Sequence, residues 1–211
     1  ELALRHLPLD LLSGSAIGAS LIALIIGILW LFGWAEITPR PVESVAIALR
    51  HSIRSRVVEE VVLRLVIFRV VWSAFGIWPA LGGGALLFGL LHLGNPDSSL
   101  LAAFALICGE GVAIGLYLIT GRIWASIGMH AAWNFTQGWI FGAAVWGTSS
   151  IAGGPLALQP PAGAPDLLSG GGFGPEASLA AVIVSLTASA LLLLRAWKLG
   201  WFTPADENDP S

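Results

Sequence analysis

The chain has 211 residues, of which 56% are hydrophobic and 11% are charged. Soluble domains contain about 25% charged residues, so this composition excludes an ordinary soluble protein and indicates an integral membrane protein. The net charge of −3 gives no basis for a nucleic-acid partner, and a single cysteine, Cys108, excludes an internal disulfide.

Six apolar stretches approach the length of about 20 residues that a helix needs to cross a membrane. The first is long and has no convincing cleavage site, so we expect no signal peptide. The sequence predicts an all-α fold, a polytopic membrane helix bundle of about six spans. In chain order the expected spans are 16–34, 57–75, 79–93, 99–119, 123–145 and 177–197.

The segments between the spans differ in character. Residues 36–56 carry four arginines, and their second half is expected to form an amphipathic helix on the membrane surface. Residues 147–175 are rich in glycine and proline and predict a long loop. An acidic tail at 203–211 is expected to be disordered. Without an internal repeat, we expect a single membrane domain over 1–211, with a core of catalytic type at about 50–194.

Charged side chains at the head of the second span are the least expected feature of so apolar a chain. Glu59, Glu60 and Arg64 would each cost several kcal/mol in a membrane unless paired or facing a polar cavity. Glu60 and Arg64 are four residues apart and share a helix face, so we expect Arg64 to neutralise Glu60. Glu59 points about 100° away and stays free for chemistry.

Two further spans contribute polar side chains at compatible depths. His92 ends the third span, and His130 and Asn134 share one face of the fifth. We call the membrane face that holds residues 36–56 side A. The direction of each span predicts that these three side chains and Glu59 converge on one cavity open to side A.

Hydrolysis is the chemistry that suits this set. Glu59 with His92 can hold and deprotonate a water molecule, and His130 with Asn134 can stabilise an oxyanion. The alternative is that these residues form structural hydrogen bonds between helices, which the common depth of the set disfavours.

Two charged residues deeper in the bundle are also expected to interact. Arg69 and Glu110 lie at similar depth from side A, and we expect them to pair across the second and fourth spans. The alternative is that each of them lines the cavity.

Three motifs resemble those of the CPBP family of intramembrane proteases, also called the CAAX-protease and bacteriocin-processing (Abi) family. Residues 92–96 and 172–176 also resemble segments of its bacterial members, and the resemblance covers about 50–194. Leu65 departs from the family, where a glycine often follows the motif arginine. The motifs are Glu59-Glu60-x-x-x-Arg64, Phe88-x-x-x-His92 and His130-x-x-x-Asn134.

The resemblance implies an intramembrane endopeptidase that cleaves a membrane-associated or lipidated peptide near the membrane face. Glu59 and His92 would activate the water, and His130 and Asn134 would form the oxyanion site. The supporting ion pair would be Glu60 and Arg64. The expected location is the plasma (inner) membrane, with the site opening to the cytoplasm, because the arginines of side A are clustered.

The residues alone leave the dependence on a metal open. Glu59, His92 and His130 would supply three zinc ligands and leave a fourth position free, as catalytic zinc sites do. Against zinc, the sequence has no His-Glu-x-x-His motif and no cysteine ligand. Asn134 is also a better oxyanion donor than zinc ligand. We therefore expect a metal-free site without a cofactor.

Two other functions compete with the endopeptidase. A non-catalytic family member would act as an immunity factor, or as a subunit or assembly factor with a partner in a membrane complex. The complete polar set disfavours this reading. A carrier would use Glu59, Glu60 and Glu110 as a proton relay, but no inverted repeat supports it.

Overall fold

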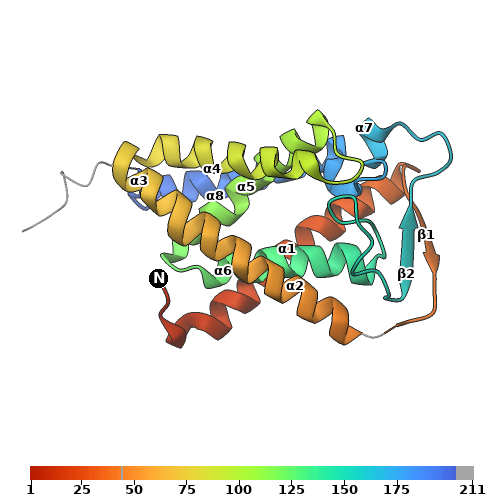
Figure 1. The fold of residues 1–211 in the computed structure, drawn as a ribbon, viewed down its shortest axis with the longest axis horizontal. Coiled ribbons are helices and arrows are strands. Elements are labelled where there is room, and N and C mark those ends of the chain that lie inside the picture. Colours follow the sequence, from red (N-terminus) through yellow and green to blue (C-terminus); the bar gives the residue numbers. More distant parts are fainter. Residues whose placement is uncertain (44, 203–211) are drawn as a thin grey trace, which may run out of the picture.

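Apolar runs of the sequence form long helices in the computed structural model, which describes residues 1–43 and 45–202 (Figure 1). Within the described residues, four helical stretches are long and apolar enough to cross a membrane: Leu4–Leu31, Ile77–Gly94, Leu100–Thr120 and Leu179–Lys198. They contain α1 (Leu7–Leu31), α4 (Ile77–Leu91), α5 (Leu100–Thr120) and α8 (Leu179–Lys198). Short 3-10 turns, Leu4–His6 and His92–Gly94, extend the first two.

The second expected span is part of a longer and more polar helix. Helix α2 (Val45–Glu60) continues through a π-helical segment (Val61–Phe68) into α3 (Arg69–Phe75) without leaving helical backbone angles. The helix expected in the second half of 36–56 is present, but it is the first part of this same long helix.

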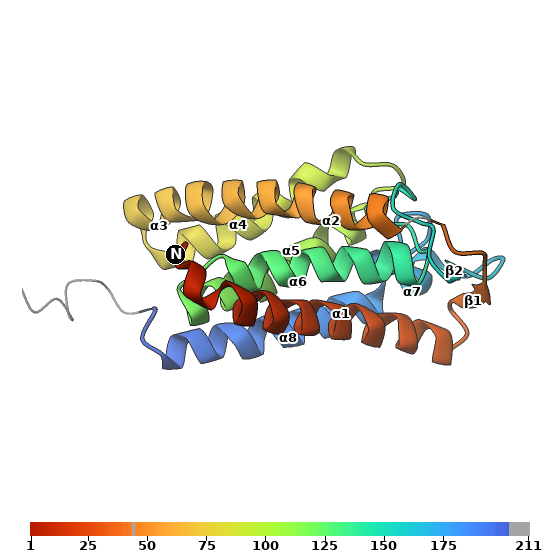
Figure 2. The same cartoon turned by 90° about the horizontal axis from the view of Figure 1, so that it is seen from below.

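The fifth expected span is shorter than predicted. Helix α6 (Trp124–Phe135) passes into a second π-helical segment (Thr136–Ile140), and the helix ends there. Figure 2 shows α6 lying between α1 and α2. The two helices that correspond to the second and fifth spans therefore belong to the bundle. They are not among the four stretches that are long and apolar enough to span by themselves.

Glycines allow the helices to approach closely, as in many membrane bundles. A Cβ atom at Gly14 or Gly18 of α1 would lie 2.0 Å from a backbone carbonyl oxygen of α6. On α5, Gly111 and Gly115 give the same close approach to α8. The contacts of Gly14 and Gly18 fix α6 against α1, and α6 carries His130 and Asn134.

The two strands, a short helix and the loops around them gather at one end of the bundle (Figure 1). Strands β1 (Glu36–Pro39) and β2 (Leu156–Gln159) pair antiparallel there, with Glu36 opposite Gln159 and Pro39 opposite Leu156. The loop expected at 147–175 thus contains a strand, a short helix α7 (Asp166–Ser169) and part of a 3-10 turn (Pro175–Ala177). This end corresponds to side A. The expected disordered tail at 203–211 lies outside the described residues.

Candidate active site

A buried polar face runs along the first half of the long helix. Ser52, Arg56, Glu60 and Arg64 follow at intervals of four residues, and each is at most 2% exposed. Side chains four residues apart share a helix face, and this face of α2 packs against α6. Arg56 therefore lies inside the bundle with the motif residues, although its position before the expected span suggests a surface residue.

Arg64 lies between two carboxylates. Its Nε is 3.2 Å from Oε2 of Glu60, and its Nη1 donates to Oε1 of Glu110 on α5. The expected pairing of Arg69 with Glu110 is wrong. Arg69 lies five residues beyond Arg64 on another face of the helix, where its half-exposed side chain pairs with Glu1.

His130 is held by hydrogen bonds at both ring nitrogens. Its Nδ1 is 2.8 Å from Oε1 of Glu60, and its Nε2 is 3.0 Å from Nη1 of Arg56. Since a guanidinium only donates, Nε2 must accept and Nδ1 must carry the proton. His130 is therefore a neutral imidazole. It cannot donate a hydrogen bond from Nε2 while Arg56 faces that atom.

Arg56 joins the parts of the site. Its Nη1 also donates to Oε2 of Glu59 at 2.5 Å, and its guanidinium lies 4.4 Å from the ring centroid of Trp146. Glu59 keeps 31% of its side chain exposed, whereas Glu60, its neighbour in the chain, is fully buried. Glu59 is thus the accessible carboxylate of the pair, as its different helix face predicts.

His92 ends α4 with a fixed orientation. Its Nδ1 donates to the backbone oxygen of Phe88 at 2.8 Å, which leaves Nε2 as a hydrogen-bond acceptor. The Phe88 ring lies 4.6 Å from the His92 ring and 5.9 Å from the His130 ring, measured between centroids. The half-buried His92 is therefore separated from His130 by an aromatic ring.

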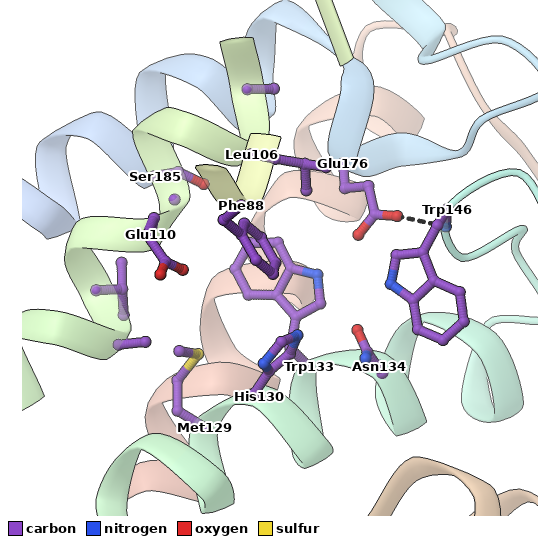
Figure 3. A pocket seen from close by; sticks show the side chains of 14 residues that line it. Phe88, Leu106, Glu110, Met129, His130, Trp133, Asn134, Trp146, Glu176 and Ser185 are labelled. Atoms are coloured by element: carbon purple, nitrogen blue, oxygen red, sulfur yellow. Dashed lines mark hydrogen bonds between the residues drawn. The ribbon is translucent and has the colours of Figure 1, made fainter. Parts of the chain in front are cut away.

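Asn134 faces a small cavity in the bundle (Figure 3). The cavity has about 60 Å³ of room for the centres of water-sized molecules. One water needs roughly 10–15 Å³ by this measure, so several fit. The buried amide nitrogen of Asn134 has no hydrogen-bond partner among the described residues. Polar or aromatic residues on the wall are Phe88, Glu110, His130, Trp133, Asn134, Trp146, Glu176 and Ser185.

The expected convergence of four residues on one cavity is seen only in part. His130 and Asn134 line the cavity, whereas Glu59 and His92 are outside the set of described residues that form its wall. Glu59 is linked to His130 through Arg56, and His92 approaches the wall at Phe88.

Glu176 is a cavity residue that the motifs do not indicate. It lies in the 3-10 turn before α8, is buried, and accepts a hydrogen bond from the Trp146 backbone N–H at 2.7 Å. Burial raises the pKa of its carboxyl to about 7. Its signal in the sequence is its place at the end of 172–176, which resembles a segment of bacterial family members without indicating a role for the carboxylate.

The arrangement does not fit a zinc site. The described residues contain no group of three His, Cys, Asp or Glu side chains that could hold a metal ion. The Nε2 lone pair of His130 faces the cationic Arg56, which also holds Glu59. Glu59, His92 and His130 therefore do not present three free ligand atoms to one point.

Comparison with protein families gives a match to part of the chain. The model of the family described as type II CAAX prenyl endopeptidase, Rce1-like, matches residues 41–136. The match begins just before α2 and ends just after Asn134, so it includes the buried polar face, His92 and His130. No curated protein and no solved structure matches the chain.

Proposed function

Residues 41–136 form a domain of the Rce1-like CAAX prenyl endopeptidase (CPBP) family, and from this premise we propose that the protein is an intramembrane endopeptidase. The observation that carries the proposal is a free amide donor, Asn134, beside the chain of contacts from Glu59 through Arg56 to His130. A water-sized cavity adjoins them inside a bundle of membrane-type helices.

Glu59 and His92 are proposed to activate the water. Glu59 is the most accessible of the site's carboxylates, and Nε2 of His92 is free to accept a proton. A water that donates to both groups would lose its proton as it attacks the peptide carbonyl. Two acceptors would thus make the water nucleophilic: Glu59, which also contacts Arg56, and Nε2 of His92.

The oxyanion that forms needs preorganised donors. Asn134 offers its unpartnered amide N–H from the cavity wall. The second donor is proposed to be the Arg56 guanidinium. His130 contributes by orienting it, because Nε2 of His130 accepts a hydrogen bond from Nη1 of Arg56. Glu60, Arg64 and Glu110 would support this arrangement, because Glu60 fixes the tautomer of His130 and Arg64 balances both carboxylates.

The substrate is proposed to be a peptide or protein held at the membrane, with prenylated CAAX proteins as the class named by the matched family. We propose that the protein resides in the plasma (inner) membrane with side A towards the cytoplasm. Exposed Arg50 and Arg54 on α2 support this orientation, because positive residues accumulate on cytoplasmic segments.

A comparison of new protein N-termini tests the proposal. Membranes from cells that carry the wild type, Glu59→Gln or Glu36→Gln at equal abundance are compared. Glu36 is an exposed carboxylate on β1, at the same end of the bundle, so it is a matched control. We expect cleavage products that disappear with Glu59→Gln and persist with Glu36→Gln. Identical termini in all three would reject the endopeptidase and favour a non-catalytic family member.

A further inference from the structure

Charges in the buried polar cluster do not balance. Four carboxyl groups, Glu59, Glu60, Glu110 and Glu176, surround two guanidinium groups, and His130 is neutral. Glu59 contacts Arg56, while Glu60 and Glu110 share Arg64. A buried carboxylate without a cation is costly and takes up a proton instead.

Glu176 is the carboxyl of the four with no ion pair among the described residues. Its Oε1 accepts from the backbone N–H of Trp146 at 2.7 Å. Figure 3 shows the carboxyl group directed into the cavity, on the side opposite His130 and facing Asn134.

The groups around Glu176 that favour its charged form are weaker than the effect of burial. The nearby polar side chains of Gln137 and Trp133 and the cation of Arg56 favour the charged form of Glu176. Neutral His130 and the Arg64-bound Glu110 are the other ionisable groups on the cavity wall. Burial outweighs these attractions and raises the pKa of Glu176 to about 7.

We propose that Glu176 is the general acid of the reaction, giving its proton to the nitrogen of the amine that leaves. This inference rests on the proposed endopeptidase function. Water adds to the carbonyl carbon as Glu59 takes one of its protons. The C–N bond then breaks, its electron pair stays on nitrogen, and the Glu176 carboxyl supplies the proton that completes the amine. The proton held by Glu59 returns to Glu176 through water, so both carboxyl groups recover their starting states.

The other acidic groups are less suited to this step. Glu60 and Glu110 have carboxylate oxygens that already contact Arg64, whereas Glu176 has no cation at contact distance among the described residues. Asn134 stabilises the oxyanion but has no proton to transfer. Glu176 reaches the same cavity from the wall opposite His130.

Amide and ester substrates distinguish a proton donor from other roles. The probe is a fluorogenic farnesylated peptide that ends in a CAAX sequence, with either an amide or an ester at the scissile position. An alkoxide leaves without a proton far more readily than an amine anion. In Glu176→Gln the amide keeps the acceptor for Trp146 but has no acidic proton. We expect kcat for the amide probe to fall about 10²- to 10⁴-fold, with KM unchanged and a much smaller loss for the ester.

The pH profile and a matched variant sharpen the test. Wild-type kcat should fall as the pH rises through about 7, when Glu176 loses its proton, and Glu176→Gln should lack this alkaline limb. Glu36→Gln, the same change at an exposed carboxylate outside the cavity wall, should leave kcat unchanged. Equal losses on both probes, or full amide turnover by Glu176→Gln, would overturn the inference.

The acid role of Glu176 and the endopeptidase activity can be tested separately. If Glu59→Gln abolishes cleavage and Glu176→Gln does not, the endopeptidase stands and the general acid is another group. If the wild type cleaves neither probe, infrared difference spectra between wild type and Glu176→Gln decide. A protonated-carboxyl band that disappears near pH 7 supports the acid state, and the lack of that band overturns it.

Discussion

Charged side chains of the site differ in what surrounds them, so their removal has different consequences. Arg64 is 1% exposed and balances both Glu60 and Glu110. Arg69, five residues later on the same helix, has a side chain that is 51% exposed. The first arginine belongs to the interior and the second to the surface, although both lie in the same apolar stretch of sequence.

Arg64→Leu is expected to destabilise the protein by about 3–5 kcal/mol, because it leaves two buried carboxylates without their cation. Arg69→Leu is expected to cost less than about 1 kcal/mol, since exposed ion pairs contribute little. Unfolding in detergent measures both variants. Equal losses would show that the buried network does not hold the bundle together.

Arg56, held by Glu59 and His130, is expected to be one of the donors to the oxyanion. Arg56→Lys keeps the charge but cannot contact Glu59 and His130 from a planar fork while stacking on Trp146. We expect kcat to fall about 10²- to 10³-fold, the usual effect of losing one oxyanion donor, with the protein still folded. Arg54→Lys, at an exposed position of the same helix, is the control and should retain full activity.

Candidate site residues could be picked out from the sequence only where the neighbouring residues in the chain were apolar. Glu59, His92 and His130 were recognisable because a polar group inside an apolar run is expensive. Arg56 and Glu176 lie just outside such runs, where charged residues are ordinary. The partner of Glu110 could not be predicted from depth alone, since the rotation of the long helix decides whether Arg64 or Arg69 faces α5.

The helices that carry Glu59 and Asn134 both change their winding next to the site. The π-helical segment Val61–Phe68 follows Glu60 directly, and the segment Thr136–Ile140 begins two residues after Asn134. π-helical turns are rare and often occur at functional sites, where the wider winding shifts later side chains around the axis.

The contact between α1 and α6 is expected to control the position of His130. Gly18→Ala would place a Cβ 2.0 Å from the carbonyl oxygen of Met129, the residue before His130. We expect a loss of about 1–3 kcal/mol from overpacking, together with lower activity. Gly27→Ala, on the same helix with no atom within 4 Å of its Cβ, is the control. Thermal unfolding in detergent compares them, and similar midpoints would contradict the close approach.

Helices were easier to predict than the pairing of strands. Four of the six expected spans coincide with helices that are long and apolar enough to cross a membrane, because length and apolarity are local properties. Strands β1 and β2 have four residues each and pair across more than a hundred residues of chain. Strands this short carry no clear alternating pattern, so nothing local in either segment indicates its partner.

The molecule has two unlike ends. One end holds the β1–β2 ribbon and α7, and the other holds the beginning of α1 and the end of α8 (Figure 1). If the bundle crosses the membrane along its length, a residue such as Ala162 lies on one face of the membrane and Leu199 on the other. Both positions are exposed, and the native Cys108 is buried.

Ala162→Cys and Leu199→Cys are expected to react with a membrane-impermeant maleimide from opposite faces. In inverted membrane vesicles the Ala162→Cys variant should be labelled without detergent, because side A is proposed to face the cytoplasm. Leu199→Cys should be labelled only after the membrane is dissolved. The wild type, with Cys108 alone, is the background control. Labelling of both variants from one face would contradict the arrangement of the spans.

The buried network also sets an order for the biogenesis of the protein. On an insertion scale each central charge costs about 2.5–3.5 kcal/mol and each large apolar residue returns about 0.3–0.6 kcal/mol. The long helix carries Arg56, Glu59, Glu60 and Arg64, whereas Glu110 and His130 are synthesised 46 and 70 residues after the groups that they contact. This helix therefore leaves the ribosome well before the side chains that neutralise it. We therefore expect the long helix to enter the membrane only together with α5 and α6, whose side chains pair with its charges.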